Sequence, residues 1–387
     1  MKTVRLKQKE ERRILRGHPW VFSNELLQPV GEFSAGEIVD VLGFAGTFVG
    51  RGYINPHTLI AVRILTRKQE EINSDFFREK IAAAHALRTT LGFGQSFRAV
   101  FSEGDGLPGL IVDKYADTLV VQSLTAGIDR MLNIIIQALQ DEYSPKAIVL
   151  RNDTTSRELE GLVQERRTIF GAITGPVTIE ESGIRYYVDV VEGQKTGFFF
   201  DQRENRQAIR AYVKGRRTLD CFCYIGAWSL AAARFGASSV IGIDTSEKAI
   251  KLASENASLN GLSAQFKTAD VFDELRRLGK ASERFGCIIL DPPAFAKSRA
   301  KVREALKGYK EINLRAMKLI EPNGTLVSCS CSHHIGQELF REMLIDTAYS
   351  AKRRARLLEM RSQARDHPML LAAPETQYLK CAVLLIE

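Results

Sequence analysis

The sequence predicts an α/β protein with a Rossmann-like domain in its second half, a small β-rich domain at its start and a central α+β domain between them. Strand-like and helix-like segments alternate from about Val177, and helices of that length between strands form parallel β-α-β units. Residues 219–229 have the pattern of a strand, a tight turn and the start of a helix. A second strand, which ends in the acid Asp244, follows about 20 residues later. An α/β sheet holds an adenosine-bearing cofactor with this combination.

Changes in pattern divide the chain into three predicted domains. Residues 1–72 contain short strand candidates between glycine-rich turns, and basic side chains crowd their opening: Lys7, Lys9, Arg12, Arg13 and Arg16. Residues 73–177 combine a helix predicted from Asp75 to Leu91 with apolar segments that suit strands or buried helices. Residues 178–387 contain the alternation of strands and helices.

The composition is that of an ordinary globular protein with a basic surface. Hydrophobic residues make up 45% of the 387 residues, and 54 basic side chains outnumber 46 acidic ones, for a net charge of +8. This charge favours a polyanionic partner such as nucleic acid, although a basic surface that binds nothing would look the same. No apolar run approaches a membrane span and the first residues form no signal core, so we expect a cytoplasmic protein with no membrane partner.

Four predicted strands end at or just before an aspartate: Asp220, Asp244, Asp270 and Asp291. Ligands of open α/β sheets bind outside the carboxyl ends of the strands, so these carboxylates are expected to face one crevice. An aspartate in this position is also a common helix cap, and capping alone is the alternative. Thr245 or Ser246 could cap the next helix instead of Asp244, which would leave Asp244 for ribose hydroxyls.

The turn after the first of these strands has a single glycine, Gly226, where a close backbone approach demands one. It lacks the GxGxxG pattern of dinucleotide sites, and the chain has no GxxxxGK[ST] phosphate loop. A cofactor with a ribose but no phosphates therefore fits better, and S-adenosylmethionine (SAM) is the expected one.

The segment 291–295, Asp-Pro-Pro-Ala-Phe, follows an apolar strand. Paired prolines end the strand and expose carbonyl groups beside the crevice. A carboxylate and carbonyl groups held there could receive the exocyclic amine of a planar base. A plain structural loop is the alternative.

The segment 328–334, Ser-Cys-Ser-Cys-Ser-His-His, opens at the same edge of the predicted sheet. A thiolate of Cys329 or Cys331 could attack an electron-poor ring carbon there. Structural cysteines and a metal site are the alternatives. The C-x-C spacing is not the C-x₂-C spacing of usual zinc sites, so we expect no metal.

The segment 193–203, Gly-Gln-Lys-Thr-Gly-Phe-Phe-Phe-Asp-Gln-Arg, precedes the first strand of the cofactor site. Its glycines allow close approach, and Lys195 could meet a carboxylate. The three phenylalanines could cover an adenine or a methionyl group. A hydrophobic loop that packs on the sheet is the alternative.

In this order, the motifs resemble those of the bacterial 23S rRNA (cytosine-5)-methyltransferase family that carries an N-terminal PUA domain. Residues 16–24, Arg-Gly-His-Pro-Trp-Val-Phe-Ser-Asn, are similar to the opening of that PUA domain. Four later segments are similar to the methyltransferase motifs: 193–203, 220–226, 291–295 and 330–332. The resemblance covers nearly the whole chain. It implies a class I SAM-dependent methyltransferase domain, and RNA binding by the PUA domain.

The resemblance also implies roles for individual residues. SAM would contact the turn from Asp220 to Gly226, which includes Phe222 and Tyr224, with its ribose at Asp244 and its adenine edge at Asp270. Cys331 aligns with the nucleophile of the S/T-Cys-Ser motif in enzymes that form 5-methylcytosine, while Cys329 lies two residues upstream, where that motif has no catalytic residue. Asp291 would bind the N3/N4 edge of the cytosine.

The expected activity is the SAM-dependent formation of 5-methylcytosine in 23S rRNA. Cys331 would add to C6 of cytosine, C5 would take the methyl group and lose its proton to a base, and elimination would free the enzyme. The expected partners are RNA, with 23S rRNA implied by the resemblance, and a second copy of the chain in a homodimer. The alternatives are a methyltransferase of a guanine nitrogen, an inactive RNA-binding protein with this fold, and a small-molecule methyltransferase.

Overall fold

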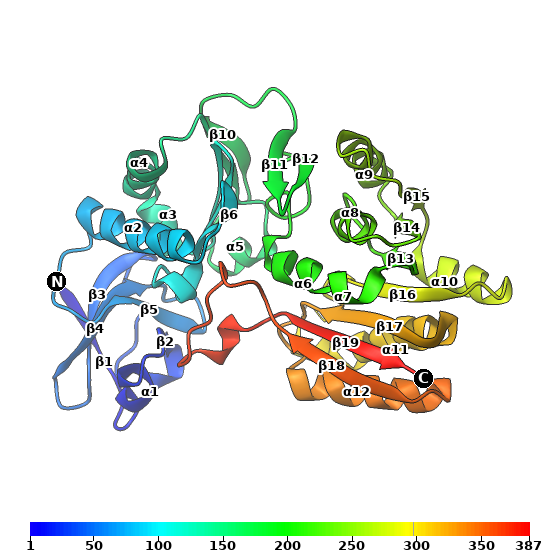
Figure 1. Cartoon of the computed structure of the whole chain (residues 1–387). Helices are drawn as coiled ribbons and strands as arrows, with labels where there is room; N and C mark the ends of the chain where they lie inside the picture. The colour runs from blue at the N-terminus through cyan, green and yellow to red at the C-terminus, as the bar shows by residue number, and fades with distance from the viewer. Residues whose placement is uncertain (297) are drawn as a thin grey trace. The chain divides into compact units, whose positions relative to one another are not determined.

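The computed structural model describes residues 1–296 and 298–387, which fall into two units (Figure 1). Unit 1 consists of residues 1–179, 188–200 and 365–376. Unit 2 consists of residues 180–187, 201–364 and 377–387. The chain enters unit 2 and returns to unit 1 within the hairpin of β11 (Val177–Glu181) and β12 (Ile184–Val188). It crosses again after Phe200 and on both sides of residues 365–376.

The first part of unit 1 is a five-stranded sheet with the order β1-β3-β4-β5-β2. Its elements are β1 (Lys2–Arg5), α1 (Glu11–Leu15), β2 (Trp20–Phe22), η1 (Ser23–Glu25), β3 (Glu37–Leu42), β4 (Phe48–Ile54) and β5 (Ile60–Thr66). The strands carry valine and isoleucine at alternating positions, and these side chains form a buried cluster of their own. The β-rich character predicted for this segment is confirmed.

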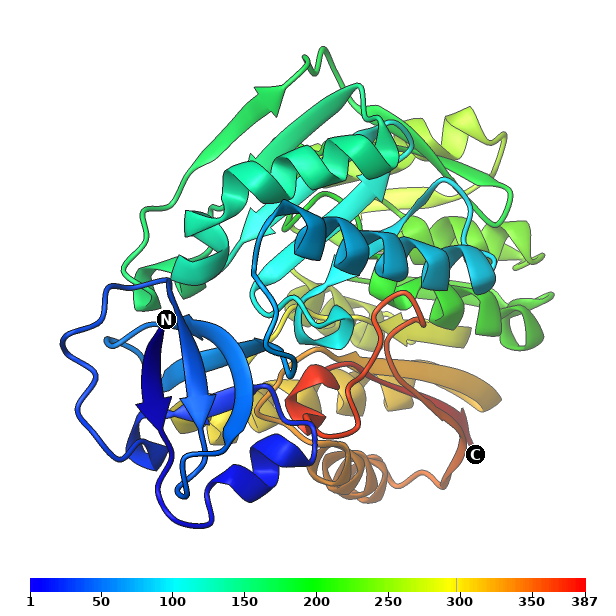
Figure 2. The same ribbon diagram turned by 90° about the vertical axis from the view of Figure 1, so that its left-hand side faces the viewer.

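The second part of unit 1 is another five-stranded sheet, with the order β10-β9-β8-β7-β6. Its elements are α2 (Ser74–Thr90), β6 (Ser96–Phe101), η2 (Ser102–Asp105), β7 (Leu110–Tyr115), β8 (Thr118–Ser123), α3 (Ala126–Arg130), α4 (Leu132–Tyr143), β9 (Ala147–Arg151), α5 (Thr155–Leu159) and β10 (Arg166–Phe170). Figure 2 shows α2 and α4 side by side. The helix predicted from Asp75 to Leu91 is α2, and Asn73 caps it by accepting from the backbone N–H groups of Asp75 and Phe76.

The two sheets of unit 1 share buried side chains. Tyr53 of β4 is fully buried in the core of the second sheet, and its hydroxyl donates to the carbonyl oxygen of Pro108 at 2.6 Å. An added Cβ at Gly127 would collide with the Tyr53 ring at 2.0 Å, so only glycine fits beneath it. The predicted boundary after residue 72 therefore lies inside one unit, between β5 and α2.

The described residues of unit 2 form a seven-stranded sheet with the order β15-β14-β13-β16-β17-β19-β18. Its strands are β13 (Arg217–Cys221), β14 (Ser239–Asp244), β15 (Gln265–Thr268), β16 (Phe285–Leu290), β17 (Ile320–Ser330), β18 (Ala355–Arg361) and β19 (Lys380–Ile386). The strands β13 to β17 are parallel to one another, as predicted, whereas β19 runs antiparallel between β17 and β18. Figure 1 shows β16, β17, β19 and β18 in this order.

Helices connect the strands of unit 2 and cover the sheet. They are α6 (Arg203–Ala208), α7 (Arg210–Val213), α8 (Ala227–Arg234), α9 (Glu247–Leu259), α10 (Val271–Lys280), α11 (Val302–Leu319) and α12 (Gln337–Ala351), with short 3₁₀ turns at η3 (Phe200–Gln202) and η4 (Arg299–Lys301). A further 3₁₀ turn, η5 (Pro374–Thr376), belongs to unit 1. Figure 1 shows α11 and α12 together on one face of the sheet, where their apolar sides join its core. The strand–helix alternation predicted for residues 178–387 is thus confirmed.

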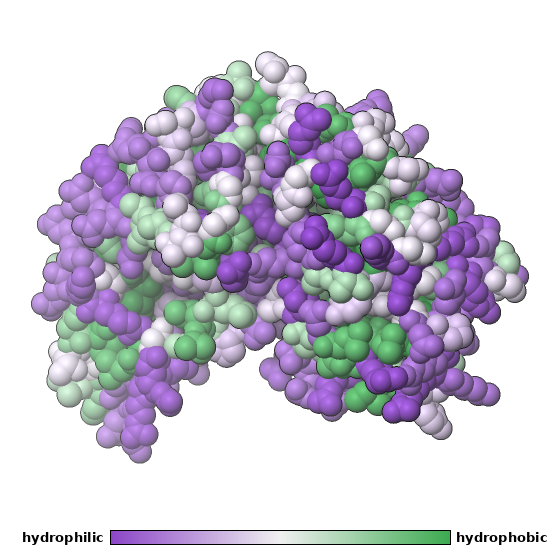
Figure 3. All heavy atoms as spheres, in the orientation of Figure 1, coloured by the Kyte–Doolittle hydropathy of each residue, from purple (hydrophilic) through white to green (hydrophobic). Residues whose placement is uncertain are grey.

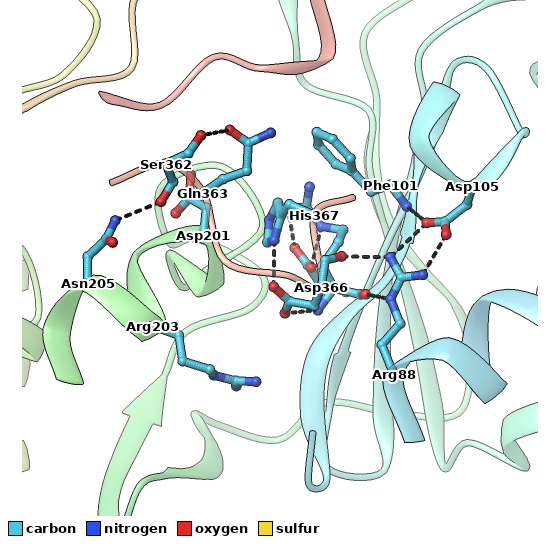
Figure 4. A network of polar contacts seen from close by, with 12 residues as sticks. Arg88, Phe101, Asp105, Asp201, Arg203, Asn205, Ser362, Gln363, Asp366 and His367 are labelled. Atoms are coloured by element: carbon cyan, nitrogen blue, oxygen red, sulfur yellow. Dashed lines mark hydrogen bonds and ion pairs between the residues drawn. The ribbon is translucent and has the colours of Figure 1, made fainter. Parts of the chain in front are cut away.

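A segment between β18 and β19 belongs to unit 1, although both strands belong to unit 2. Within unit 1, the fully buried Arg88 pairs with Asp105 and donates to the backbone oxygen of Asp366 at 2.6 Å (Figure 4). The Asp366 carboxylate accepts from the backbone N–H of Arg98 at 3.0 Å and lies 2.7 Å from Nδ1 of His367. These buried polar contacts hold residues 365–376 in unit 1.

The outer part of the unit 2 sheet exposes apolar side chains. Figure 3 shows apolar residues where β18 and β19 lie, and Leu357 and Leu358 of β18 are each 44% exposed. On α12, Ile345 is 59% and Tyr349 is 87% exposed. In the described part of the chain, none of the helices has both the length and the apolar character that a membrane crossing requires.

Candidate active site

The four predicted aspartates lie along one edge of the unit 2 sheet. The strands β15, β14, β13 and β16 are parallel neighbours, so their carboxyl ends meet at the same edge. Asp244 is the last residue of β14, Asp220 is the last but one of β13, Asp291 follows β16 directly and Asp270 comes two residues after β15. The shared edge is confirmed, and it is where open α/β sheets bind ligands.

Asp220 is a fully buried carboxyl group with one oxygen satisfied. The hydroxyl of Ser229 donates to its Oδ2 at 2.6 Å, while its Oδ1 has no hydrogen-bond partner within the described residues. Burial raises the pKa of Asp220 to about 7, and the nearby charges of Asp291 and Asp244 act in the same direction. A buried acceptor without a donor costs about 1–3 kcal/mol, so Oδ1 suits a ligand that brings an N–H donor.

Asp244 and Asp270 differ in how their carboxylates are used. Asp244 accepts from the backbone N–H groups of Tyr224 at 3.0 Å and Ser246 at 2.9 Å. Ser246 caps α9 by accepting from the backbone N–H of Ala249, so of the possible caps, Asp244, Thr245 and Ser246, it is Ser246 that caps the helix. Asp270 does cap its helix, α10, by accepting from the backbone N–H of Asp273 at 3.1 Å. A contact of Asp270 with adenine stays a prediction.

The turn after β13 has three residues in the left-handed conformation: Phe222, Tyr224 and Gly226, with φ of 66°, 49° and 84°. A Cβ at Gly226 would lie 3.0 Å from the Phe266 ring and 3.2 Å from Cβ of Ala253. Glycine is therefore required both by the backbone and by the packing of α8 on its neighbours. Phe222 and Tyr224 are partly exposed at the sheet edge.

Two side chains that the motifs did not single out orient Asp291. The indole N–H of Trp228 donates to Oδ2 and the amide of Gln202 donates to Oδ1, each at 2.9 Å. Burial is the main cause that raises the pKa of Asp291 to about 6. A carboxyl group held in this way can exchange a proton near neutral pH. Both residues lie in segments that the sequence had already marked: Trp228 at the start of the helix after β13, and Gln202 in the Asp-Gln-Arg end of the 193–203 segment. Their positions in these segments are the signals that could have found them.

The six cysteines separate by exposure. Cys331 is partly exposed, directly after β17, and its Sγ lies 3.9 Å from the carbonyl oxygen of Pro292. Cys329 is fully buried opposite Cys381 of β19, and burial raises the pKa of its thiol well above the usual range. A thiol must be accessible and ionisable to act as a nucleophile. The structural alternative therefore suits Cys329 and the other buried cysteines: Cys221, Cys223, Cys287 and Cys381.

The backbone on both sides of Cys331 is held by buried groups. The hydroxyl of Tyr309, on α11, lies 3.1 Å from the hydroxyls of both Ser330 and Ser332. Nζ of Lys380 donates to the carbonyl oxygen of Ser332 at 2.8 Å. These contacts restrict the loop, so the Cys331 side chain has a defined place beside the Asp291-Pro292 segment.

The 193–200 part of the predicted cofactor loop belongs to unit 1. Lys195 is exposed, and its Nζ lies 4.9 Å from the centre of the Phe199 ring. Phe198 and Phe200 are buried, and Phe200 packs 5.1 Å from the ring of Tyr115. The packing alternative therefore suits these two phenylalanines. A contact of Lys195 with a carboxylate of the cofactor stays a prediction.

A parallel sheet with an antiparallel strand inserted near one edge, and with buried acids at the ends of its first strands, defines a Rossmann-like class I methyltransferase. Comparison with known families agrees: residues 169–368 match the S-adenosylmethionine-dependent methyltransferase family and residues 4–67 match a PUA-like domain. Enzymes of this family use SAM, so the cofactor expected from the sequence is confirmed.

Curated relatives share the whole length of the chain. Ribosomal RNA large subunit methyltransferase I from Shewanella denitrificans is 41% identical over 97% of both chains, and that from Tolumonas auensis is 41% identical over 99% of this chain and 98% of the relative. This protein belongs to the ribosomal RNA large subunit methyltransferase I family.

Solved structures share the fold at lower identity. A SAM-dependent methyltransferase from Streptococcus mutans superposes with a TM-score of 0.85, and SMU.776, a methyltransferase crystallised with SAH, with a TM-score of 0.87. Both are 20% identical, and the similarity covers 100% of every chain. They support the fold of the whole chain.

Proposed function

We propose that this protein methylates C5 of a cytosine in 23S rRNA, with Cys331 as a covalent nucleophile. The observation that carries the proposal is the partly exposed thiol of Cys331 next to the Asp291-Pro292 segment, whose carboxyl group is oriented by two donors. Relatives with 41% identity are named for the RNA of the large ribosomal subunit, which supports this substrate. A methyltransferase of a guanine nitrogen would need no thiol in this place.

SAM fits the edge formed by β13 and β14. The unsatisfied Oδ1 of Asp220 can accept from the methionyl ammonium group, and the remaining lone pairs of Asp244 can accept from ribose hydroxyls. When bound, SAM supplies an electrophilic methyl group. The other proposed contacts in unit 2 come from the turn and from the end of β15: Phe222, Tyr224, Gly226 and Asp270.

The proposed reaction uses the thiolate to activate the base. The sulfur of Cys331 forms a bond to C6 of cytosine, and the electron pair of the C5–C6 double bond makes C5 nucleophilic. C5 then takes the methyl group and loses its proton to a base. The C5–C6 double bond re-forms as the C6–S bond breaks and returns the thiolate.

Asp291 would hold the N3/N4 edge of the cytosine. Its carboxylate can accept from the exocyclic amine, and its pKa of about 6 lets it provide a proton to N3 as negative charge develops in the ring. Trp228 and Gln202 keep both oxygens in place, so the carboxyl group does not need to reorganise during the reaction. Electrostatic contributions of this kind are worth about 3 kcal/mol.

The PUA-like domain is proposed to grip the RNA backbone. Its opening residues carry exposed cations at Lys7, Lys9, Arg12 and Arg16. Phosphate contacts of this kind position an RNA, while the active site reads one base that leaves the stack. Binding should therefore weaken as salt concentration rises.

A homodimer is proposed from the exposed apolar residues on β18 and α12: Ile345, Tyr349, Leu357 and Leu358. Their burial against a second copy would remove them from water. The mass in solution, measured by light scattering, tests this, with Tyr349→Glu as the variant expected to separate the copies. A monomer at all concentrations would contradict it.

The test of the activity compares Cys331→Ala with Cys329→Ala in cells that lack the native gene. Mass mapping of methylated nucleotides in 23S rRNA is expected to show a 5-methylcytosine that needs the protein, that persists with Cys329→Ala and that is lost with Cys331→Ala. Methylation that persists with Cys331→Ala would overturn the covalent mechanism. A methyl group mapped to a guanine would replace the proposed base.

A further inference from the structure

Lys380 brings a buried cation to the loop that carries Cys331. It is the first residue of β19, is 4% exposed and pairs in register with Ser330 of β17, the residue before Cys331. Its Nζ donates to the carbonyl oxygens of Ser332 and Tyr378, both at 2.8 Å. The ammonium group therefore lies beside the backbone that follows Cys331.

Within residues 1–296 and 298–387, the bonds of Lys380 go to carbonyl oxygens and no carboxylate lies within 4.0 Å of its Nζ, although most buried lysines pair with one. Other ionisable groups lie on the neighbouring elements: Cys329 on β17, Glu359 and Arg361 on β18, and Tyr309 on α11, whose hydroxyl lies 3.1 Å from that of Ser332. Burial lowers the pKa of Lys380 to about 8, and the negative charge of the Cys331 thiolate acts in the opposite direction and raises it. Because the attraction between two charges is mutual, an ammonium group that is stabilised by the thiolate also stabilises the thiolate.

We propose that Lys380 is a positioning residue whose positive charge keeps Cys331 in the thiolate form, while its two bonds to carbonyl oxygens fix the loop. This inference rests on the proposed role of Cys331 as the nucleophile. Cys331 must be ionised before it can add to the base. Lys380 provides the opposite charge from a neighbouring strand, and it does so before any substrate arrives.

The alternative is a lysine that only satisfies two carbonyl oxygens. Lys114 is a matched example in unit 1: its Nζ donates to the carbonyl oxygens of Gln95 and Ala116, and burial lowers its pKa as well. Lys114→Met removes the same kind of buried ammonium group, but from unit 1 and not from the loop that carries Cys331. It serves as the control for Lys380→Met, and Lys380→Arg serves as the variant that keeps the charge.

The experiment measures the rate of alkylation of Cys331 by iodoacetamide against pH, without RNA, with the modified peptide identified by mass spectrometry. The other five cysteines are buried, so Cys331 should react first. In Lys380→Met the midpoint is expected to rise by about one pH unit and the rate at neutral pH to fall about tenfold. Lys380→Arg and Lys114→Met should keep the midpoint of the unchanged protein.

A midpoint that stays the same in folded Lys380→Met would overturn the inference. If this variant does not fold, the ultraviolet titration of the thiolate in the unchanged protein decides: a midpoint below the ordinary cysteine value of about 8.5 supports the inference, and one at or above that value refutes it. Methyl transfer by Cys331→Ala is a separate measurement. If Cys331→Ala still transfers methyl groups, Cys331 is not the nucleophile and the proposed function fails. If Cys331→Ala is inactive but the alkylation midpoint of Lys380→Met is unshifted, only the proposed role of Lys380 fails.

Discussion

Replacement of Asp220 by asparagine should change how the stability of unit 2 depends on pH. The pKa of Asp220 rises from 3.8 to about 7 on folding because the group is buried. The folded state therefore holds this proton more tightly than the unfolded state, so its contribution to stability is present at low pH and is lost as pH rises to about 7. One pKa unit is worth 1.36 kcal/mol, so about 3 kcal/mol should be lost between about pH 5 and about pH 8.

The asparagine side chain has no charge to bury, so the variant lacks this loss. The free energy of unfolding of Asp220→Asn minus that of the unchanged protein should rise by about 3 kcal/mol between the two pH values. Differences that do not depend on pH, such as an altered bond to Ser229, cancel in this comparison. The loss of the charge should at the same time weaken SAM binding, because the proposed partner of the methionyl ammonium group is gone.

The assay is urea unfolding without SAM, followed by tryptophan fluorescence. The chain has two tryptophans, Trp20 and Trp228, so a Trp20→Phe background leaves Trp228 as a probe inside unit 2. Asp273→Asn is the control, since Asp273 is an exposed carboxylate in the same unit. If the difference for Asp220→Asn stays constant between the two pH values within the error of extrapolation, the argument from burial is refuted.

Three further outcomes follow from single contacts. Gly226→Ala should lower the free energy of unfolding by about 1–3 kcal/mol, because alanine is strained at a φ of 84° and its Cβ would crowd a ring at 3.0 Å; an unchanged urea midpoint would contradict this. Trp228→Phe should slow methyl transfer about tenfold, because Asp291 loses one donor, while SAM binding measured by calorimetry stays the same; full activity would show that the indole N–H is dispensable. Asn256→Ala should cost about 2 kcal/mol in urea unfolding, since the fully buried amide binds the backbone of two segments; no loss would mean that water replaces it.

Much of the fold could be predicted because its signals are local. Alternation of apolar strands with helices of ordinary length implies parallel β-α-β units, and the connection rules then place the strand ends at one edge. Asp220, Asp244, Asp270 and Asp291 were therefore expected at a common edge. Ser246 could be anticipated as the cap of α9 because serine is a strong N-cap residue and directly precedes the helix.

The pairing of distant segments has no such local signal. The sequence alone did not show that β19 inserts antiparallel between β17 and β18, or that residues 365–376 belong to unit 1. These outcomes depend on which buried surfaces fit together once several elements have formed, and many pairings have the same apolar pattern. The choice between capping and ligand binding at Asp270 likewise needed the observed hydrogen bond.

The sequence by itself determined the class of this protein: a SAM-binding α/β sheet with acids at its strand ends, a PUA-like opening and a cysteine motif after the fifth parallel strand. Tertiary structure decided which groups can act, because burial and proximity are properties of the packed chain. It buries Cys329 and leaves Cys331 partly exposed, and it orients Asp291 through Trp228 and Gln202. It also brings Lys380 from near the end of the chain to the loop that carries Cys331, since only strand pairing across the sheet makes these residues neighbours.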